Sequence, residues 1–225
     1  NDMVHPKHLV NQKLWYSKYL DGSHTVLDLG CGSAQATLKI AGKVKHVIAT
    51  DIDKKSLDIG LNGAQRKGIT NIDFRIVDAN KKLPFKNKSF DVIICSDVLE
   101  HLSKRTFAIN EMRRVLKTKG LLLLVTDNPD NSWKKLQKSQ GLSFYADKDH
   151  KYEYPKKEII KVLKENKMRV INVSTVTYDT PLKGLIDLTG GFSLTLYKRL
   201  RKWKESMVKK HPEETTGYRI VAVKI

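Results

Sequence analysis

The sequence predicts an α/β fold of the doubly wound type, in which a seven-stranded sheet, mostly parallel with an antiparallel last strand, carries helices on both faces. Short apolar runs alternate with amphipathic stretches along the chain, which is the pattern of parallel strands joined by crossover helices. A chain of 225 residues is long enough for one well-buried domain and too short for two full ones. Since it also contains no internal repeat and no Pro/Gly-rich linker, we expect a single domain over residues 1–225.

The apolar runs and the helical periodicities locate most of the elements. Strands are predicted at residues 25–30, 46–50, 71–77, 90–95, 121–125, 168–178 and 216–225. Helices are predicted at residues 5–20, 34–41, 54–67, 105–116 and 155–166. The last two strands are separated by the basic insertion 179–215, which is far longer than a usual connection. We expect this insertion to act as a cap.

The composition limits the classes of protein to which the chain can belong. No apolar run approaches the roughly 20 residues that span a bilayer, and the N-terminus lacks the basic-then-apolar pattern of a secretion signal. Cys31 and Cys95 both fall in apolar, strand-like stretches, so a disulfide framework is not expected. These features favour a cytoplasmic protein.

The formal net charge of +18 comes from 42 Lys and Arg against 24 Asp and Glu. Such an excess attracts nucleic acid, anionic membranes or acidic ligands through a long-range field. A lysine-rich proteome would give the same charge to an enzyme of small molecules. The position of the basic residues is therefore more informative than their number.

Two glycines lie where the first predicted strand ends, in the sequence Val26-Leu-Asp-Leu-Gly-Cys-Gly-Ser-Ala. Because Gly30 and Gly32 have no Cβ, the backbone can turn sharply there and a ligand can lie against it. A loop that binds a dinucleotide would carry a third glycine at position 35, which here is Gln35. The loop is therefore suited to a ligand that carries no phosphate.

Three aspartates lie near the carboxyl ends of the first three predicted strands, and ligands of open α/β sheets bind at that edge. Asp51 follows the glycines by about 20 residues, where a carboxylate can accept both ribose hydroxyl protons. Asp78 could accept from an adenine amino group. An aspartate alone often only caps a helix or a turn. Together with Asp28, however, these residues indicate a ligand site.

Further motifs follow in order along the chain. They are Leu83-Pro-Phe-Lys-Asn-Lys-Ser-Phe-Asp-Val-Ile, Leu99-Glu-His-Leu and Glu111-Met-Arg-Arg-Val-Leu-Lys-Thr-Lys-Gly. With the glycine loop and the aspartates, they make residues 25–126 resemble the class I S-adenosylmethionine-dependent methyltransferases. More narrowly, the chain is similar to the branch that includes ubiquinone, sterol and other small-molecule methyltransferases. This resemblance implies a Rossmann-like fold and S-adenosyl-L-methionine as the cofactor.

The resemblance also implies which residues hold the methionine part of the cofactor. Gly30, Cys31 and Gly32 would pass beneath it. Asp28 would orient that loop and reach the amino group. Ser96, at the end of the fourth predicted strand, would lie near the methyl group that is transferred.

The adenosine part is assigned in the same way. Asp51 would hold the ribose hydroxyls, with Ile52 against the adenine ring. Asp78 and Ala79 would meet the edge of the adenine.

Methyl transfer from a sulfonium is a displacement that requires positioning more than covalent work by the protein. A base is needed only if the acceptor must lose a proton. His101, just after the fourth predicted strand, is the nearest candidate by sequence, and His150 is a second one. Alternatively, His101 only packs or bonds the backbone at a helix start. The histidines lack any metal-ligand spacing, so no metal is predicted.

Two segments, 127–154 and 179–215, are expected to build the acceptor pocket at the cofactor edge of the sheet. Their aromatic residues suggest an apolar or flat acceptor, although some of them must simply pack the insertion on the sheet. These residues are Trp133, Phe144, Tyr145, Tyr152, Tyr154, Phe192, Tyr197 and Trp203.

Residues 194–210 form a basic amphipathic pattern. Leu196, Leu200, Trp203 and Met207 fall on one helical stripe, and lysines and arginines fill most of the rest. A basic helix with tryptophan on its apolar side is typical of a helix that contacts an anionic membrane. A solvated lid helix packed on the domain, or a contact with RNA phosphates, would use the same residues.

These observations predict a methyltransferase that acts on a small-molecule or lipid-like acceptor and makes a peripheral contact with an anionic membrane through residues 194–210. A nucleic-acid (RNA) methyltransferase is the alternative, disfavoured because the chain shows no RNA-binding module. A cofactor-binding partner protein without catalytic activity is a third, more distant alternative.

Overall fold

Strands and helices alternate along residues 14–145 and 147–225, which are the residues that the computed structural model describes. The strands are β1 (Thr25–Leu29), β2 (His46–Asp51), β3 (Ile72–Ile76), β4 (Phe90–Ser96), β5 (Leu116–Asp127), β6 (Met168–Thr175) and β7 (Gly217–Lys224). The helices are α1 (Thr37–Ile40), α2 (Lys54–Arg66), α3 (Arg105–Val115), α4 (Ser132–Ser139), α5 (Lys156–Glu165), α6 (Lys183–Phe192) and α7 (Leu194–Lys210). Short 3-10 turns are η2 (Ser17–Tyr19), η3 (Ala41–Lys43), η4 (Leu99–His101) and η5 (Pro212–Glu214).

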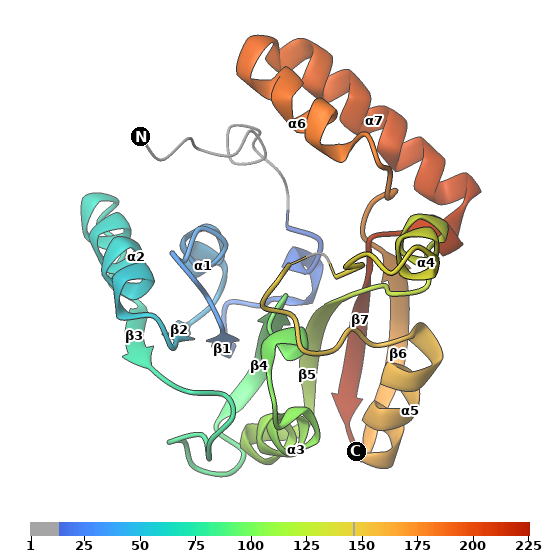
Figure 1. Ribbon diagram of the computed structural model, residues 1–225. Helices are drawn as coiled ribbons and strands as arrows, with labels where there is room; N and C mark the ends of the chain where they lie inside the picture. The colour runs from blue at the N-terminus through green and yellow to red at the C-terminus, as the bar shows by residue number, and fades with distance from the viewer. Residues whose placement is uncertain (1–13, 146) are drawn as a thin grey trace.

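The seven strands form one twisted sheet in the order β3-β2-β1-β4-β5-β7-β6 (Figure 1). Strands β1 to β5 are parallel, and β7 runs antiparallel to both of its neighbours. The predicted doubly wound sheet with an antiparallel last strand is confirmed. The strand order reverses between β1 and β4, so the carboxyl ends of these strands form the edge where such sheets bind ligands.

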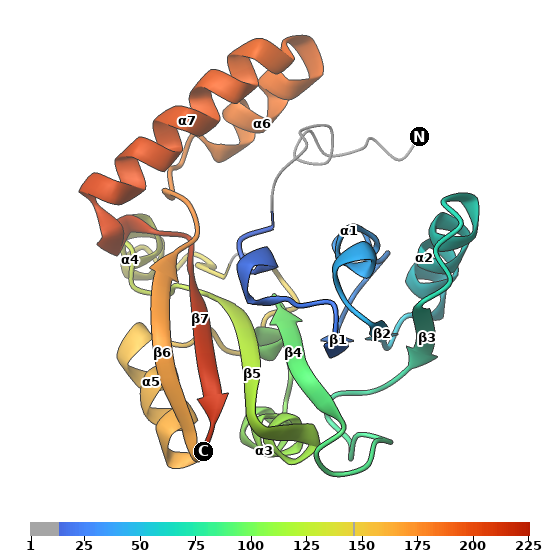
Figure 2. The same ribbon diagram turned by 180° about the vertical axis from the view of Figure 1, so that it is seen from behind.

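Side chains of the central strands enter two cores, one on each face of the sheet. In β1, Leu27 and Leu29 join the core that also contains α3 and α5, whereas Val26 joins the core that contains α1. In β4, Ile93 and Ile94 divide between the two cores in the same way. Figure 2 shows the sheet from behind, with α5 on the far side of β6 and β7. Burial on both faces explains why these strands are apolar without alternation.

The N-terminal helix predicted at residues 5–20 lies mostly outside the described residues, which begin at residue 14. Its described end is not an α-helix but the 3-10 turn η2. Tyr16, next to this turn, is buried in the core that contains α1, and the Trp15 ring packs edge-on against it at 5.4 Å between centroids. Ring packing on the sheet therefore takes the place of the predicted helix there.

The prediction placed the fifth strand at residues 121–125, with a turn at Lys119 and Gly120 after the helix. In the structure, β5 begins directly after α3, at Leu116, which is buried and pairs with Phe90. Lys119 adopts a left-handed φ of 63°, and the register shifts along β4 between Phe90 and Val92. The predicted turn is therefore an irregularity inside the strand.

The insertion between β6 and β7 forms the α6–α7 hairpin, residues 183–210, which rises from the carboxyl edge of the sheet (Figure 1). The residues that α7 buries are Tyr197, Lys204 and Val208, so the predicted apolar stripe is not the side that packs on the domain. Leu196 and Trp203 are instead 45% and 41% exposed. Among the described residues, no helix is both long and apolar enough to cross a membrane.

Candidate functional site

The glycine loop after β1 turns the chain at the carboxyl edge of the sheet. Gly30 and Gly32 adopt left-handed φ angles of 77° and 51°. A Cβ on Gly30 would lie 2.2 Å from the Val98 Cγ2, so this glycine is needed for packing within the protein. A Cβ on Gly32 would meet no atom within 4 Å, so its open side is available to a ligand. The amide groups of Gly30 and Cys31 both donate to the Thr50 carbonyl, at 2.8 and 2.9 Å, and tie the loop to β2.

Asp51, the last residue of β2, holds the glycine loop from the other side. Its Oδ2 accepts from the Gly32 amide at 2.8 Å, and its Oδ1 accepts from the Asp53 amide at 2.9 Å. Each carboxylate oxygen has a second lone pair, so both can still accept from the hydroxyl groups of a ligand. Ile52, the next residue, is 67% exposed and offers an apolar surface beside this carboxylate.

Asp28 lies beneath the same loop, buried in β1. Burial raises the pKa of its carboxyl group to about 6. A hydrogen bond from the Thr37 Oγ1 at 2.6 Å favours the ionised form and partly offsets this increase. The negative charge of Asp51 adds a further, smaller increase in this pKa. A positively charged group bound next to Asp28 would favour its ionised form.

Asp78 follows β3 at the same edge. Its Oδ1 accepts from the Asn80 amide at 2.9 Å, a bond that holds the pKa of Asp78 below its usual value. The ionised carboxylate remains an acceptor at neutral pH, and Ala79 beside it is buried. The Asn80 side chain accepts from the Ser103 amide at 2.8 Å, which fixes this turn against the start of α3.

A cavity of about 510 Å³ lies between the carboxyl ends of the strands and the α6–α7 hairpin. Asp97 and Asp127 line it from the sheet, and Ile186 and Tyr197 line it from the hairpin. Its volume is in the range of sites for small molecules. Ser96, at the end of β4, precedes Asp97 and is partly exposed.

The two histidines named from the sequence lie together, although 49 positions separate them along the chain. The rings of His101 and His150 meet edge to face, with 4.6 Å between their centroids. His101 is partly exposed in η4, and its backbone amide donates to the Val98 carbonyl at 3.0 Å. His150 is buried, and its Nδ1 lies 2.9 Å from the Glu153 Oε1.

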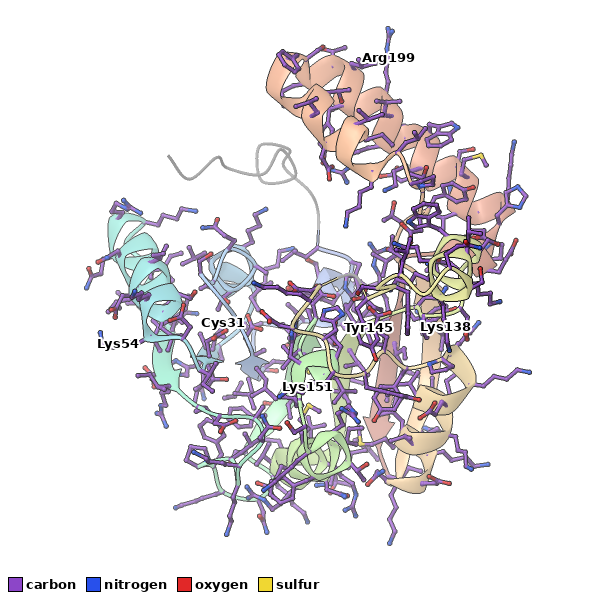
Figure 3. The ribbon with its side chains drawn as sticks, viewed as in Figure 1. Cys31, Lys54, Lys138, Tyr145, Lys151 and Arg199 are labelled. Carbon is purple, nitrogen blue, oxygen red and sulfur yellow. The ribbon has the colours of Figure 1, made fainter. Side chains whose placement is uncertain are left out.

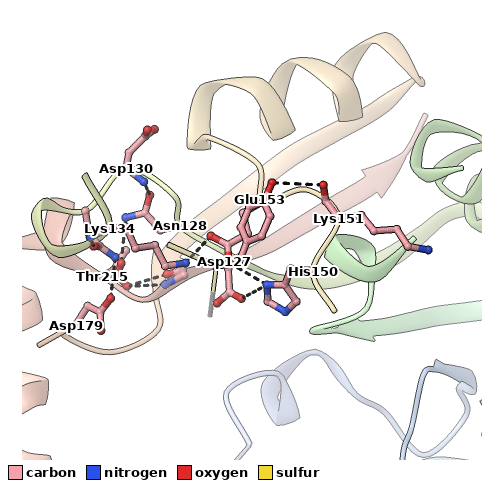
Figure 4. Close-up of polar contacts among 12 residues, drawn as sticks. Asp127, Asn128, Asp130, Lys134, His150, Lys151, Glu153, Asp179 and Thr215 are labelled. Carbon is pink, nitrogen blue, oxygen red and sulfur yellow. Dashed lines mark hydrogen bonds and ion pairs between the residues drawn. The ribbon is translucent and has the colours of Figure 1, made fainter. Parts of the chain in front are cut away.

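A buried polar cluster next to these histidines was not predicted (Figure 4). Glu153 forms an ion pair with the buried Lys134. Glu100 is fully buried, and burial, together with the charges of nearby acids, raises its pKa to about 8. Burial also raises the pKa of Asp127 to about 6. The sequence offered one signal, because Glu100 belongs to the motif Leu99-Glu-His-Leu, but no chemistry was assigned to it.

Comparison with known proteins identifies the family of this chain. Residues 20–178, more than half of the chain, match the family model described as a methyltransferase domain. The chain is 37% identical over 102 residues to the uncharacterized methyltransferase YcgJ of Bacillus subtilis. It is 35% identical over 122 residues to the ubiquinone/menaquinone biosynthesis C-methyltransferase UbiE of Vibrio vulnificus. These alignments cover 45% and 50% of this chain, and 40% and 46% of the two relatives' own lengths.

Solved structures share the fold over nearly the whole chain. The crystal structure of the Bacillus YcgJ protein superposes with a TM-score of 0.67 at 22% identity and covers 92% of this chain and 95% of that one. An S-adenosylmethionine-dependent methyltransferase from Methanosarcina mazei superposes with a TM-score of 0.69 at 20% identity, over 96% of this chain and 99% of that one.

The residues of the site fit the cofactor of this family. The open side of Gly32 offers a surface for the methionine part of the cofactor. The two oxygens of Asp51 and the exposed Ile52 offer acceptors and an apolar contact for an adenosine without phosphates. The match over residues 20–178 and the fold agree with the resemblance of the motifs. The chain therefore belongs to the class I S-adenosylmethionine-dependent methyltransferases.

Proposed function

We propose that this chain transfers a methyl group from S-adenosylmethionine to a small-molecule or lipid-like acceptor that it meets at an anionic membrane surface. The observation that carries this proposal is an exposed apolar face on the α6–α7 hairpin, next to the cavity at the end of the sheet. Some relatives are named as methyltransferases of ubiquinone or menaquinone biosynthesis, which also favours a small acceptor for this chain.

The bound cofactor would supply an electrophilic methyl group on a sulfonium. Asp51 would accept from the ribose hydroxyls while it holds the Gly32 amide, and Asp78 and Ala79 would meet the adenine edge. Asp28 would attract the amino group of the methionine part from below the loop. This assignment leaves Ser96 and the cavity beyond it on the side of the transferable methyl group.

The acceptor would bind in the 510 Å³ cavity, where the sheet edge and the hairpin meet. Tyr197 and Ile186 give the hairpin wall aromatic and apolar surface among the charged side chains of Lys183, Asp187, Arg201, Lys204 and Glu205. Asp97 and Asp127 give the opposite wall acidic groups. Holding a reactive atom of the acceptor in line with the methyl group can supply much of the rate. For an acceptor that must lose a proton, His101 is our candidate base, because it is partly exposed near this edge.

The membrane-facing surface is formed mainly by α6. Leu185, Leu188 and Phe192 recur at spacings of three and four on one face of this helix, and they are 63%, 59% and 84% exposed. Leu194 and Trp203 on α7 are also exposed, at 40% and 41%. Several large apolar side chains exposed along one helical face are typical of interaction surfaces.

Basic residues on α7 flank that surface. Lys198, Arg199 and Lys202 are exposed, and Arg199 projects from the end of the molecule far from the sheet (Figure 3). An apolar face bordered by lysines and arginines is suited to anionic lipid, where side chains enter the acyl boundary and cations meet the headgroups. A hairpin docked in this way would bring the cavity close to a lipid-like acceptor.

Replacing Leu185, Leu188 and Phe192 together with Ser should reduce binding to anionic vesicles by at least about 10-fold. The expectation follows from the roughly 1.5–3 kcal/mol that each buried apolar side chain contributes. Co-sedimentation with vesicles of phosphatidylcholine and phosphatidylglycerol measures this, and affinity for S-adenosylmethionine should not change.

The matched control is the replacement of Ile59 and Leu61 with Ser, because these residues are 54% and 40% exposed on the distant helix α2. This control should bind vesicles like the wild type, and added salt should weaken the binding of both. If the wild type binds anionic vesicles no better than the α6 variant, the proposed membrane surface is wrong.

A further inference from the structure

We propose that Glu100, Asp127 and His150 bind a divalent metal ion at the wall of the acceptor cavity. One ligand atom from each of these residues lies within 4.8 Å of the others. The three residues come from η4, from the end of β5 and from the segment before α5, so the fold brings together groups that are far apart in sequence. The metal site is inferred from this geometry alone, and only its use in catalysis rests on the proposed function.

The environment of Glu100 is the second observation. Its side chain is fully buried, and neither carboxylate oxygen has a hydrogen-bond partner among the described residues. Burying a carboxyl group without a partner is costly, because the group loses its hydrogen bonds to water. A metal ion would provide the missing partner, and the oxygens of Asp127 and a ring nitrogen of His150 are within reach of the same ion.

The charges around the three ligands also favour a cation. Asp97 and Glu153 lie near Glu100, so with Asp127 four acidic groups from three segments of the chain gather there. The buried Lys134 ammonium forms its ion pair with Glu153 and also lies near Asp127. This local excess of acid is unexpected in a chain with a net charge of +18.

The position of His150 is supported by its neighbours. Its Nδ1 lies 2.9 Å from the Glu153 Oε1 and 3.5 Å from the Asp127 Oδ2, and the other oxygen of Glu153 is held by Lys134 (Figure 4). Histidine ligands in metal sites are usually oriented by a carboxylate in this way. Glu153 is therefore a positioning residue in this proposal, and because it holds Nδ1, the nitrogen of His150 that binds the ion would be Nε2.

The set of two carboxylates and one imidazole indicates the class of ion. Carboxylates suit Mg²⁺ and Mn²⁺, whereas imidazole suits Zn²⁺ and Fe²⁺, so Mn²⁺ and Zn²⁺ match the mixed set best. Three protein ligands leave positions open for water or for an acceptor. Asp127 lines the acceptor cavity, so an oxygen of the acceptor could occupy an open position and lose its proton to water more easily.

The test is a titration of the full chain with Mn²⁺, in which binding is measured as the loss of the free-ion signal in electron paramagnetic resonance. The titration is repeated with Zn²⁺, whose binding is measured by competition with a chromophoric chelator. We expect a stoichiometry near one. Glu100→Gln and Asp127→Asn should each weaken binding by about 10-fold or more. Glu153→Gln should weaken it less, and Asp58→Asn on the exposed face of α2 should have no effect.

Circular dichroism of each variant separates a lost ligand from a lost fold, and Glu100→Gln keeps the shape of the side chain. The proposal is overturned if neither ion binds the wild type below millimolar concentration, or if Glu100→Gln binds both ions as the wild type does. Because metal binding is measured without cofactor or acceptor, its absence would not affect the proposed methyl transfer. Metal binding by a chain that transfers no methyl group would contradict only the proposed function.

Discussion

Replacing Asp51 with Ala should lower the affinity for S-adenosylmethionine by at least about 100-fold, since two hydrogen bonds to a charged acceptor contribute about 1.5–3 kcal/mol each. The variant removes two functions of the carboxylate at once, which are support of the glycine loop and binding of the ribose. The carboxylate holds the Gly32 amide at 2.8 Å and the Asp53 amide at 2.9 Å, and it is our acceptor for the ribose hydroxyls. Isothermal titration calorimetry with the purified chain measures this affinity.

The control for this variant is Asp58→Ala, which removes the same charge from the exposed surface of α2. It should bind the cofactor with the affinity of the wild type. Equal affinity of Asp51→Ala and the wild type would mean that the adenosine part binds elsewhere, and it would contradict the assigned site.

Gly30→Ala should mainly lower the stability of the protein, whereas Gly32→Ala should mainly lower its affinity for the cofactor. At Gly30 the new Cβ would lie 2.2 Å from the Val98 Cγ2 in a backbone with a φ of 77°. Left-handed strain of about 1–2 kcal/mol and overpacking of about 1–3 kcal/mol predict a Tm lower by roughly 10 °C. Differential scanning fluorimetry without ligand measures this change.

Gly32→Ala carries only the left-handed strain of about 1–2 kcal/mol, so its Tm should fall by about 2–8 °C, less than that of Gly30→Ala, while cofactor affinity falls by about 10-fold or more. Its Cβ would meet no protein atom within 4 Å, so it would project into the open side of the loop, where we place the methionine part. The opposite pattern, with Gly32→Ala unstable and Gly30→Ala normal, would show that the loop packs in another way.

Local sequence patterns were sufficient for the central part of the fold. The strands that contain Leu27 and Ile93 are buried on both faces, and strands of this kind can be predicted from a continuous apolar run. The acids at the carboxyl ends were also predictable, because each follows its strand in a parallel sheet and the carboxyl ends of such strands share one edge. In the structure, Asp51 accepts from the Gly32 amide, and the buried Asp28 lies near enough to Asp51 for their charges to interact.

Other features depended on tertiary packing. The helix α4 is short and polar, and its Asn131 cap, which accepts from the Lys134 amide at 2.9 Å, resembles many loop residues in sequence. On α7, Tyr197 and Lys204 are buried and line the cavity, whereas the pattern that places Trp203 on an apolar stripe left open whether that stripe packs on the domain or is exposed. Periodicity predicts that a helix is amphipathic, but a partner helix decides which side becomes buried.

The polar cluster around Glu100 likewise depends on tertiary packing and could not be predicted from local sequence patterns. The sequence predicted no metal, because its histidines lack the close spacing of familiar metal motifs. The proposed ligands are contributed by residues 100, 127 and 150, and only the folded sheet brings them within 4.8 Å of one another. The burial of Glu100 without a partner could not be inferred from the motif in which it occurs.

The most direct test of the proposed function is the transfer of a labelled methyl group from S-adenosylmethionine into an extract of the source organism. The extract is then separated into lipid, small-solute, nucleic-acid and protein fractions, with Asp51→Ala as the control. We predict that the label enters the lipid or small-solute fraction with the wild type and is lost with Asp51→Ala. Label confined to nucleic acid would contradict the proposed acceptor and favour an RNA methyltransferase, and no Asp51-dependent label in any fraction would contradict catalysis itself.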